Sequence, residues 1–77
     1  MYSNLIGNEL RAIRSRNNLS LKEVEEKTGI YAQTLSEYEN NKIKIKVSTL
    51  EKILKDAYNT DLYIFFKLLY ENTHIQK

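Results

Sequence analysis

The sequence lacks cysteine, proline and tryptophan, and it contains only two glycines in 77 residues. Without cysteine the chain has neither disulfide bonds nor thiolate metal ligands, so packing must supply its stability. The scarcity of proline and glycine favours helices over a turn-rich β fold. A chain of this length forms one small domain over residues 1–77, too small for two lobes that enclose a deep cleft.

Long apolar runs are also absent. The longest one, Leu62 to Phe66, covers five residues, whereas a membrane-spanning helix needs about 20. The N-terminus lacks the basic start and the long apolar stretch of a signal peptide. We therefore expect a cytoplasmic protein that does not bind a membrane.

Groups for catalysis or metal binding are few. His74 is the only histidine and lies near a polar C-terminus, and no set of nucleophile, base and acid can be assembled without it. The sequence has no glycine-rich phosphate loop and no histidine or cysteine spacing for a metal. We therefore expect that the protein is not an enzyme and that it binds neither a metal nor a cofactor. A small-molecule ligand is not expected either, because a domain this small offers no obvious pocket.

Apolar spacing predicts five helices, of which the first two have clear ends. Three apolar residues spaced four and three apart place a helix near residues 4–16, and the asparagines at 17–18 end it. Ser20 and Glu23 form a capping box that begins a short second helix. Gly29 stands where a left-handed residue would end that helix.

A third helix is predicted from about Ala32 to Glu39, and the asparagines at 40–41 end it. Residues 42–46 alternate lysine and isoleucine. We interpret them as an extended loop, because five residues without a partner strand cannot form a stable sheet. Ser48 and Glu51 form a second capping box and are predicted to begin the fourth helix.

The fifth helix, about residues 61–71, follows a stop at Asn59 and is capped by Thr60 or Asp61. It is apolar around most of its circumference, which indicates burial on more than one side. A second copy of the chain would cover the outer side in a homodimer. The residues expected in that contact are Tyr63, Ile64, Phe66, Leu68 and Tyr70. The alternative is a closing helix covered by Tyr2 and Leu5 of the same chain.

Two short helices joined by a tight glycine-containing turn, over about residues 20–40, are typical of a helix-turn-helix motif. Over about residues 5–69 the sequence resembles the Cro/C1-type (XRE-type) helix-turn-helix repressors of bacteria and phages. The segments that carry the resemblance are Ile6 to Arg14, Leu19 to Val24, Lys27 to Ile30 and Leu35 to Lys42. The resemblance implies an all-α fold, a five-helix lambda-repressor-like DNA-binding domain, and double-stranded DNA as the partner.

The resemblance also implies roles for single residues. The third helix would be the recognition helix in the major groove, and four residues match its base-facing positions: Tyr31, Ala32, Gln33 and Glu37. Arg14 and Glu39 match a pair that forms an internal salt bridge in many members. Leu21 replaces a glutamine that often contacts phosphate. Glu25 replaces a small residue, so it must point outward or pair with Lys22 or Lys27.

The chemistry of these side chains suits the edges of DNA bases. Gln33 can form a bidentate contact with adenine N6 and N7, and Glu37 can accept from cytosine N4. The Tyr31 hydroxyl can reach a phosphate while its ring packs on a sugar or a thymine methyl group. Ala32 is small enough to contact a thymine methyl group.

Affinity for DNA comes mainly from phosphate contacts, yet the third helix has no lysine or arginine. The formal net charge is only +2, but residues 1–46 hold eight basic and six acidic residues, whereas residues 47–77 hold four of each. Arg11 and Arg16 add positive charge on the first helix. The residues expected to contact phosphate are Lys22, Thr34, Ser36, Asn40, Lys42, Lys44 and Lys46.

The sequence therefore predicts a transcriptional repressor that binds a palindromic operator as a homodimer. The alternative is a helix-turn-helix module that binds a protein, such as an antirepressor, an inhibitor or an antitoxin-like partner. In that interpretation the acidic second helix and the aromatic fifth helix are the contact surfaces.

Overall fold

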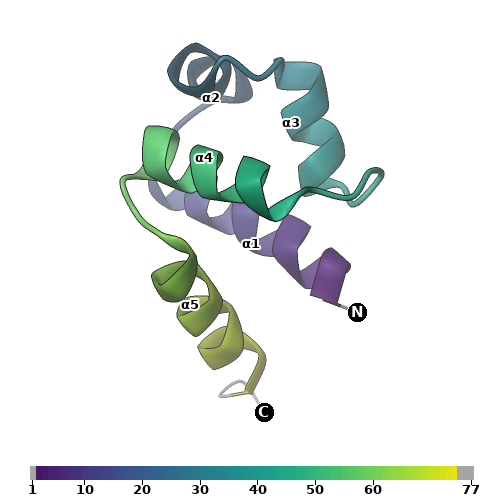
Figure 1. Ribbon diagram of the computed structural model, residues 1–77, viewed down its shortest axis with the longest axis vertical. Helices are drawn as coiled ribbons and strands as arrows, with labels where there is room; N and C mark the ends of the chain where they lie inside the picture. Colours follow the sequence, from purple (N-terminus) through teal and green to yellow (C-terminus); the bar gives the residue numbers. More distant parts are fainter. Residues whose placement is uncertain (1, 75–77) are drawn as a thin grey trace.

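The computed structural model describes residues 2–74, and within this range the side chains of residues 5–71. The described part contains five α-helices and no strand. They are α1 (Tyr2–Arg16), α2 (Leu21–Thr28), α3 (Ala32–Glu39), α4 (Val47–Tyr58) and α5 (Leu62–His74) (Figure 1). The predicted all-α, five-helix fold is confirmed. Among residues 2–74, no helix has both the length and the apolar character that a membrane span requires.

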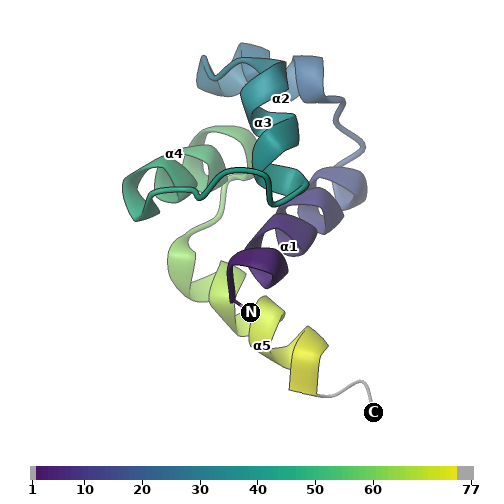
Figure 2. The same ribbon diagram turned by 90° about the vertical axis from the view of Figure 1, so that its right-hand side faces the viewer.

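The helices divide the molecule into two ends. Figures 1 and 2 show α2 and α3 at one end, α1 and α4 across the middle, and α5 at the other end. α1 packs on α3 and α5, and α4 packs on α2 and α5. The motif helices and the aromatic fifth helix are therefore far apart in the fold, each held by the same central pair.

One hydrophobic core joins all five helices. Its buried residues are Leu10, Ile13, Val24, Leu35, Leu50, Ile53, Leu54, Tyr58 and Phe65. Leu54 is fully buried, and Leu50, Ile53 and Phe65 are each 1 % exposed. The apolar side of α1, predicted from spacings of four and three, packs here through Leu10 and Ile13, as expected for an amphipathic helix.

The predicted helix ends are largely confirmed. The Ser20 hydroxyl accepts the Glu23 amide at 3.1 Å, and the Ser20 amide donates to the Glu23 carboxylate at 2.8 Å. Gly29 has φ 79° and ends α2, and Asn59 has φ 51° and ends α4. At the start of α5 the Asp61 carboxylate accepts the Ile64 amide at 2.9 Å, so Asp61 is the capping side chain.

The second capping box is wrong. α4 begins at Val47, with Lys46 in the N-cap position and no side chain capping it. Ser48 therefore lies inside the first turn, where its hydroxyl is no longer in the N-cap geometry that a capping box needs. Just before α4 begins, Ile45 packs against the core.

In the alternative interpretation, Tyr2 and Leu5 of the same chain cover the fifth helix. The side chains of Tyr2 and His74 lie outside the described residues. Leu5 is partly buried, and α1 does contact α5. This contact leaves several apolar side chains of α5 exposed, among them Tyr63, which is 74 % exposed.

α1 approaches the end of α3 closely at Gly7. A Cβ atom at this position would lie 2.6 Å from the Tyr38 carbonyl oxygen and would also overlap Asn41 Oδ1. Asn41 adopts φ 61°, a left-handed conformation that asparagine tolerates. Gly7 and Asn41 together thus let α1 pass close beneath the segment that leaves α3.

We predict that Gly7→Ala lowers the free energy of unfolding by up to about 2 kcal/mol. Overpacking of this kind costs about 1–3 kcal/mol, which outweighs the gain of about 1 kcal/mol that alanine brings to a helix interior. Urea unfolding measures the change. The control is Asn8→Ala, at the next and exposed position of α1, which should not destabilise the protein. Equal stabilisation by both substitutions would contradict the close approach.

Candidate nucleic-acid interface

The turn between α2 and α3 is built from local hydrogen bonds. The Gly29 amide donates to the Glu25 carbonyl oxygen at 2.7 Å, which closes the end of α2. The Thr28 hydroxyl donates to the Val24 carbonyl oxygen at 2.8 Å and accepts the Ile30 amide at 3.2 Å. These bonds satisfy backbone groups that a helix end leaves open, so the motif turns tightly without burying unpaired amides.

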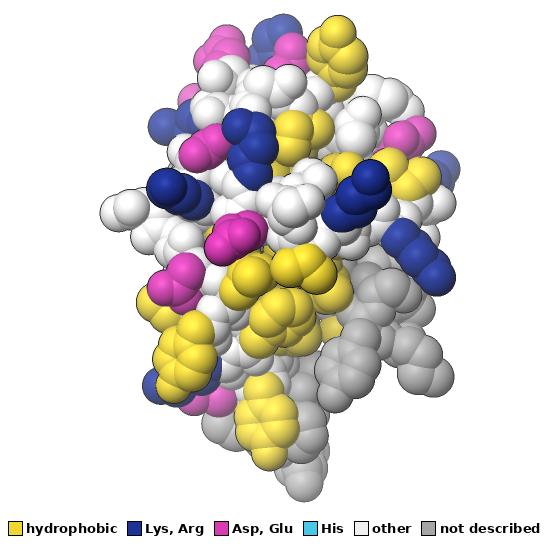
Figure 3. Space-filling view, viewed as in Figure 1, with side chains coloured by type: hydrophobic (Ala, Val, Ile, Leu, Met, Phe, Trp, Pro, Cys, Tyr) yellow, Lys and Arg dark blue, Asp and Glu magenta, His cyan; other side chains and the backbone are white. Residues whose placement is uncertain are grey.

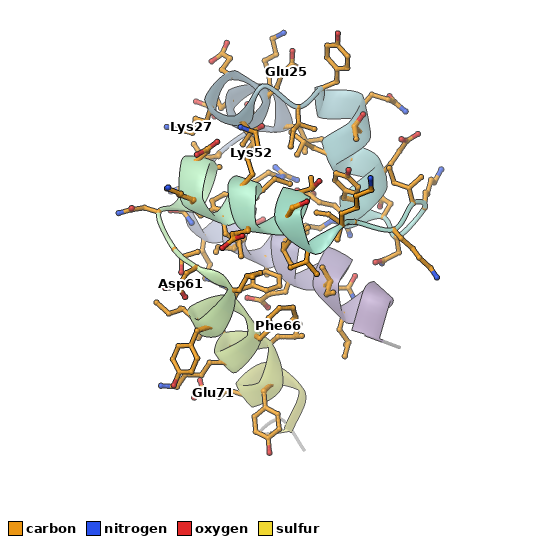
Figure 4. All side chains as sticks on the ribbon, in the orientation of Figure 1. Glu25, Lys27, Lys52, Asp61, Phe66 and Glu71 are labelled. Atoms are coloured by element: carbon orange, nitrogen blue, oxygen red, sulfur yellow. The ribbon has the colours of Figure 1, made fainter. Side chains whose placement is uncertain are left out.

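The start of α3 is held from outside the helix. Its N-cap residue, Tyr31, provides no side-chain hydrogen bond. Glu25 of α2 does so in its place, because its Oε1 accepts the Ala32 amide at 2.9 Å. Glu25 Oε2 lies 3.6 Å from Lys22 Nζ, so the expected pairing with Lys22 is also present. Figure 4 labels Glu25 beside the turn between the two helices.

No pattern in the sequence indicates the bond from Glu25 to Ala32. The two residues are seven positions apart and belong to different helices, so no capping pattern within one helix contains both. The one available signal was a long acidic side chain at a position where a small residue is usual. That signal indicated a departure from the family but not what the carboxylate contacts.

The structure brings the expected base-contacting residues onto one surface of α3. Tyr31 is 74 % exposed, Gln33 is exposed, and Ala32 and Glu37 are partly exposed. Gln33 Nε2 lies 3.4 Å from Glu37 Oε2, one helical turn along. Leu35 is buried on the opposite side. α3 therefore packs through one face and presents polar groups on the other.

The lysines expected to contact phosphate lie next to this surface. Lys42, Lys44 and Lys46 are all exposed, on the loop that leads from α3 to α4. Figure 3 shows dark blue side chains on the side of the molecule where Figure 1 draws this loop. Lys22 is exposed at the start of α2. The positive charge therefore flanks α3 at both ends without lying on it.

Two of the uncharged residues expected to contact phosphate are hydrogen-bonded to each other. Asn40 Nδ2 donates to the Ser36 carbonyl oxygen at 2.9 Å and to its hydroxyl at 3.2 Å. Arg11 of α1 donates to Asn40 Oδ1 and, at 3.4 Å, to the Glu39 carbonyl oxygen. Thr34, nearer the start of α3, is partly exposed. Arg11 thus joins the end of α3, a role that sequence analysis did not assign to it.

The predicted salt bridge between Arg14 and Glu39 is confirmed. Arg14 Nε lies 2.7 Å from Glu39 Oε2 and its Nη2 lies 3.0 Å from Oε1, a bidentate pair. Nη1 donates to the Leu19 carbonyl oxygen at 2.9 Å. Glu39 is 6 % exposed, and its hydrogen bond raises the Arg14 pKa against the opposing effect of burial. Arg16, in contrast, pairs with Glu9 at 2.8 Å.

Tyr58 of α4 closes the core beside this ion pair. Its side chain is 9 % exposed, and burial raises its pKa to about 12. The negative charge of Glu39 adds to this effect, whereas Arg14 opposes it. The buried phenol is therefore protonated at neutral pH.

At the other end of the molecule, α5 exposes the apolar residues expected in a dimer contact. Tyr63 is 74 % exposed, Tyr70 61 %, Ile64 44 % and Phe66 39 %, whereas Leu68 is partly buried. Figure 3 shows hydrophobic side chains gathered around the position where Figure 4 labels Phe66. The Phe66 ring meets the buried Phe65 ring edge-on, 5.3 Å between centroids, which fixes its orientation.

Comparison with known proteins places this geometry in a family. The family model for helix-turn-helix proteins matches residues 10–62, from α1 to the start of α5. No curated protein matches the chain. Among the described residues, no group of three or more histidine, cysteine, aspartate or glutamate side chains could hold a metal ion.

We predict that the protein loses stability at alkaline pH through Tyr58. The folded-state pKa, about 12, lies above the ordinary value of 10.0. The stabilisation is therefore fully present below pH 10.0 and is lost as the pH rises towards about 12, by about 2–3 kcal/mol. Urea unfolding at a series of pH values measures this loss. Tyr58→Phe should show a flatter alkaline limb, and an identical limb in both proteins would contradict the assignment.

Proposed function

The chain belongs to the Cro/C1-type helix-turn-helix family of DNA-binding regulators, and we propose that it is a repressor that binds a palindromic operator as a homodimer. The observation that carries the proposal is the polar outer surface of α3, with exposed Gln33 beside Glu37 and Leu35 buried behind them. A helix of this kind fits the major groove, where base edges carry a distinct donor and acceptor pattern.

The proposed base contacts follow from the chemistry of each side chain. Gln33 offers a donor and an acceptor to adenine N7 and N6, and Glu37 accepts from cytosine N4. Tyr31 and Ala32 stand at the start of α3, where the ring and the methyl group can contact thymine methyl groups or sugar. Because Gln33 and Glu37 lie within 3.4 Å of each other, they meet neighbouring bases.

The proposed phosphate contacts flank these bases. The three loop lysines bind DNA phosphates on one side of α3. Lys22, at the start of α2, binds phosphates on the other side. Thr34, Ser36 and Asn40 add uncharged hydrogen bonds, which position the helix but carry no sequence information. Because α3 has no lysine or arginine, the loop lysines supply most of the electrostatic affinity for DNA.

The proposed dimer contact is the exposed face of α5. Aromatic residues such as Tyr63, Phe66 and Tyr70 are enriched at the centres of protein interfaces. α5 lies at the end of the molecule opposite α2 and α3, so pairing through it leaves both recognition helices free. A two-fold axis there makes the operator palindromic, with half-sites about 10 bp, or ~34 Å, apart.

A protein-binding module is the second candidate, and the exposed aromatic face of α5 favours it. Such a face suits an apolar surface of another protein as well as a second copy of this chain. Glu23 and Glu26 add an exposed acidic face on α2. In this second function, α3 would not contact DNA and its polar surface would simply be solvated.

Selection of bound DNA from a random pool tests the proposed repressor. We expect the wild type to enrich two inverted half-sites about 10 bp apart. Gln33→Ala should still bind but lose its preference at one position of each half-site, because a bidentate base contact contributes about 1–3 kcal/mol of discrimination. Glu51→Ala, an exposed change on α4, is the matched control and should enrich the wild-type sequence.

The other results of this selection decide against parts of the proposal. No enrichment at about 50 mM salt, where phosphate contacts are strong, would exclude the repressor and favour the protein-binding module. Single half-sites without a symmetric partner would contradict the homodimer. Equal weakening of all sequences by Gln33→Ala would make Gln33 a phosphate contact.

We also predict that replacing the three loop lysines by alanine weakens binding to every DNA sequence. Each neutralised phosphate contributes about 0.9 to the slope of log affinity against log salt, so the slope should become shallower by about 2–3. Fluorescence titrations across a salt series measure it. Alanine at Lys52 and Lys55, both exposed on α4, is the control and should leave the slope unchanged. An unchanged salt slope in the loop variant would show that these lysines do not contact DNA phosphates.

A further inference from the structure

We propose that Glu25 of α2 is a positioning residue for the recognition helix, whose side-chain oxygen fixes the first turn of α3 and thereby sharpens the choice between operator and other DNA. This role rests on the proposed DNA-binding function but adds a determinant of specificity that touches no base. The juxtaposition that carries it is the 2.9 Å hydrogen bond from the Ala32 amide to Glu25 Oε1.

The first turn of α3 has little else to hold it. Helices leave their first amides without partners inside the helix, and a side chain at the N-cap commonly satisfies one of them. Tyr31 occupies that position here and provides no hydrogen bond. α3 is only eight residues long, so one unsecured turn is a large part of it. The bond from Glu25 is therefore the side-chain contact that secures the first turn of α3.

Glu25 itself is well placed to act as an anchor. It stands on the second turn of α2, a helix that begins with a complete capping box and buries Val24 and Thr28. Its carboxylate is further steadied by Lys22, whose Nζ lies 3.6 Å from Oε2. The side chain is 27 % exposed, so solvent competes only partly for its oxygens. The anchored turn carries Gln33, the residue proposed to read adenine, directly after Ala32.

The charge of Glu25 has a separate consequence from its oxygen. A carboxylate at the start of α3 repels any nearby phosphate and occupies an amide that could otherwise donate to one. This repulsion weakens binding to operator and to other DNA alike, because phosphate contacts are independent of sequence. The oxygen, in contrast, acts on the orientation of the base-contacting residues and so affects operator binding alone. Two substitutions separate the two effects.

Glu25→Ala removes both the oxygen and the charge, whereas Glu25→Gln keeps an acceptor oxygen of the same reach and removes only the charge. Glu26→Ala and Glu26→Gln are matched controls at the neighbouring, exposed position of α2. Each protein is titrated with the selected operator and with unrelated duplex DNA at one salt concentration. Hydrogen exchange of the Ala32 amide is measured in the free proteins.

We expect Glu25→Ala to lower the ratio of operator to unrelated-DNA affinity by about fivefold, the effect of losing one helix cap. Its Ala32 amide should exchange at least about tenfold faster, because the amide is left open to water. Glu25→Gln should keep the wild-type ratio and protection while binding both DNAs about twofold tighter. Both Glu26 variants should keep the wild-type ratio.

An unchanged ratio in Glu25→Ala would overturn the proposal, and so would an equal loss of ratio in Glu25→Gln or Glu26→Ala. Should Glu25→Ala fail to fold, Glu25→Asp replaces it, since its side chain is one methylene shorter and does not reach Ala32. If the wild type itself binds no DNA, the proposed function fails. The exchange of the Ala32 amide then still decides whether Glu25 holds α3.

Discussion

The bidentate ion pair between Arg14 and Glu39 is the contact on which the placement of the motif depends. It joins the last turn of α1 to the last residue of α3, and the same guanidinium also donates to the Leu19 carbonyl oxygen in the connection before α2. One side chain thus fixes three segments. Glu39 is 6 % exposed, so its charge would be costly without these donors. Tyr58 packs beside the pair, where its burial keeps the phenol protonated.

Each end of α3 is held by a carboxylate that forms a contact between two helices. Glu39 ties the C-terminal end to α1, and Glu25 ties the N-terminal end to α2. Between them Leu35 is buried, so the helix cannot rotate without losing its packing. These constraints leave the outer surface of α3 polar and exposed. The lysines expected to contact phosphate lie outside α3, on the loop that follows it and at the start of α2.

Much of the fold follows from patterns that act within a few residues. The capping box of Ser20 and Glu23, the left-handed Gly29 and the stop at Asn59 were all predictable, because each satisfies backbone groups of its own helix end. The pattern of Ser48 and Glu51 failed although it is chemically the same. There Ile45 packs on the core and the chain becomes helical at Val47, two residues too early for Ser48 to cap the helix. Tertiary packing overrode a local preference worth about 1 kcal/mol.

The sequence by itself determined the number of helices, their apolar faces and the motif, because periodicity and capping are properties of neighbouring positions. The family resemblance indicated which residues lie on the outer surface of α3 and that Arg14 pairs with Glu39. Only the tertiary structure decided that Glu25 reaches Ala32, that Arg11 joins Asn40, and that Gly7 lets α1 pass beneath Asn41. Those contacts join residues of different helices, and their distances depend on how the whole core packs.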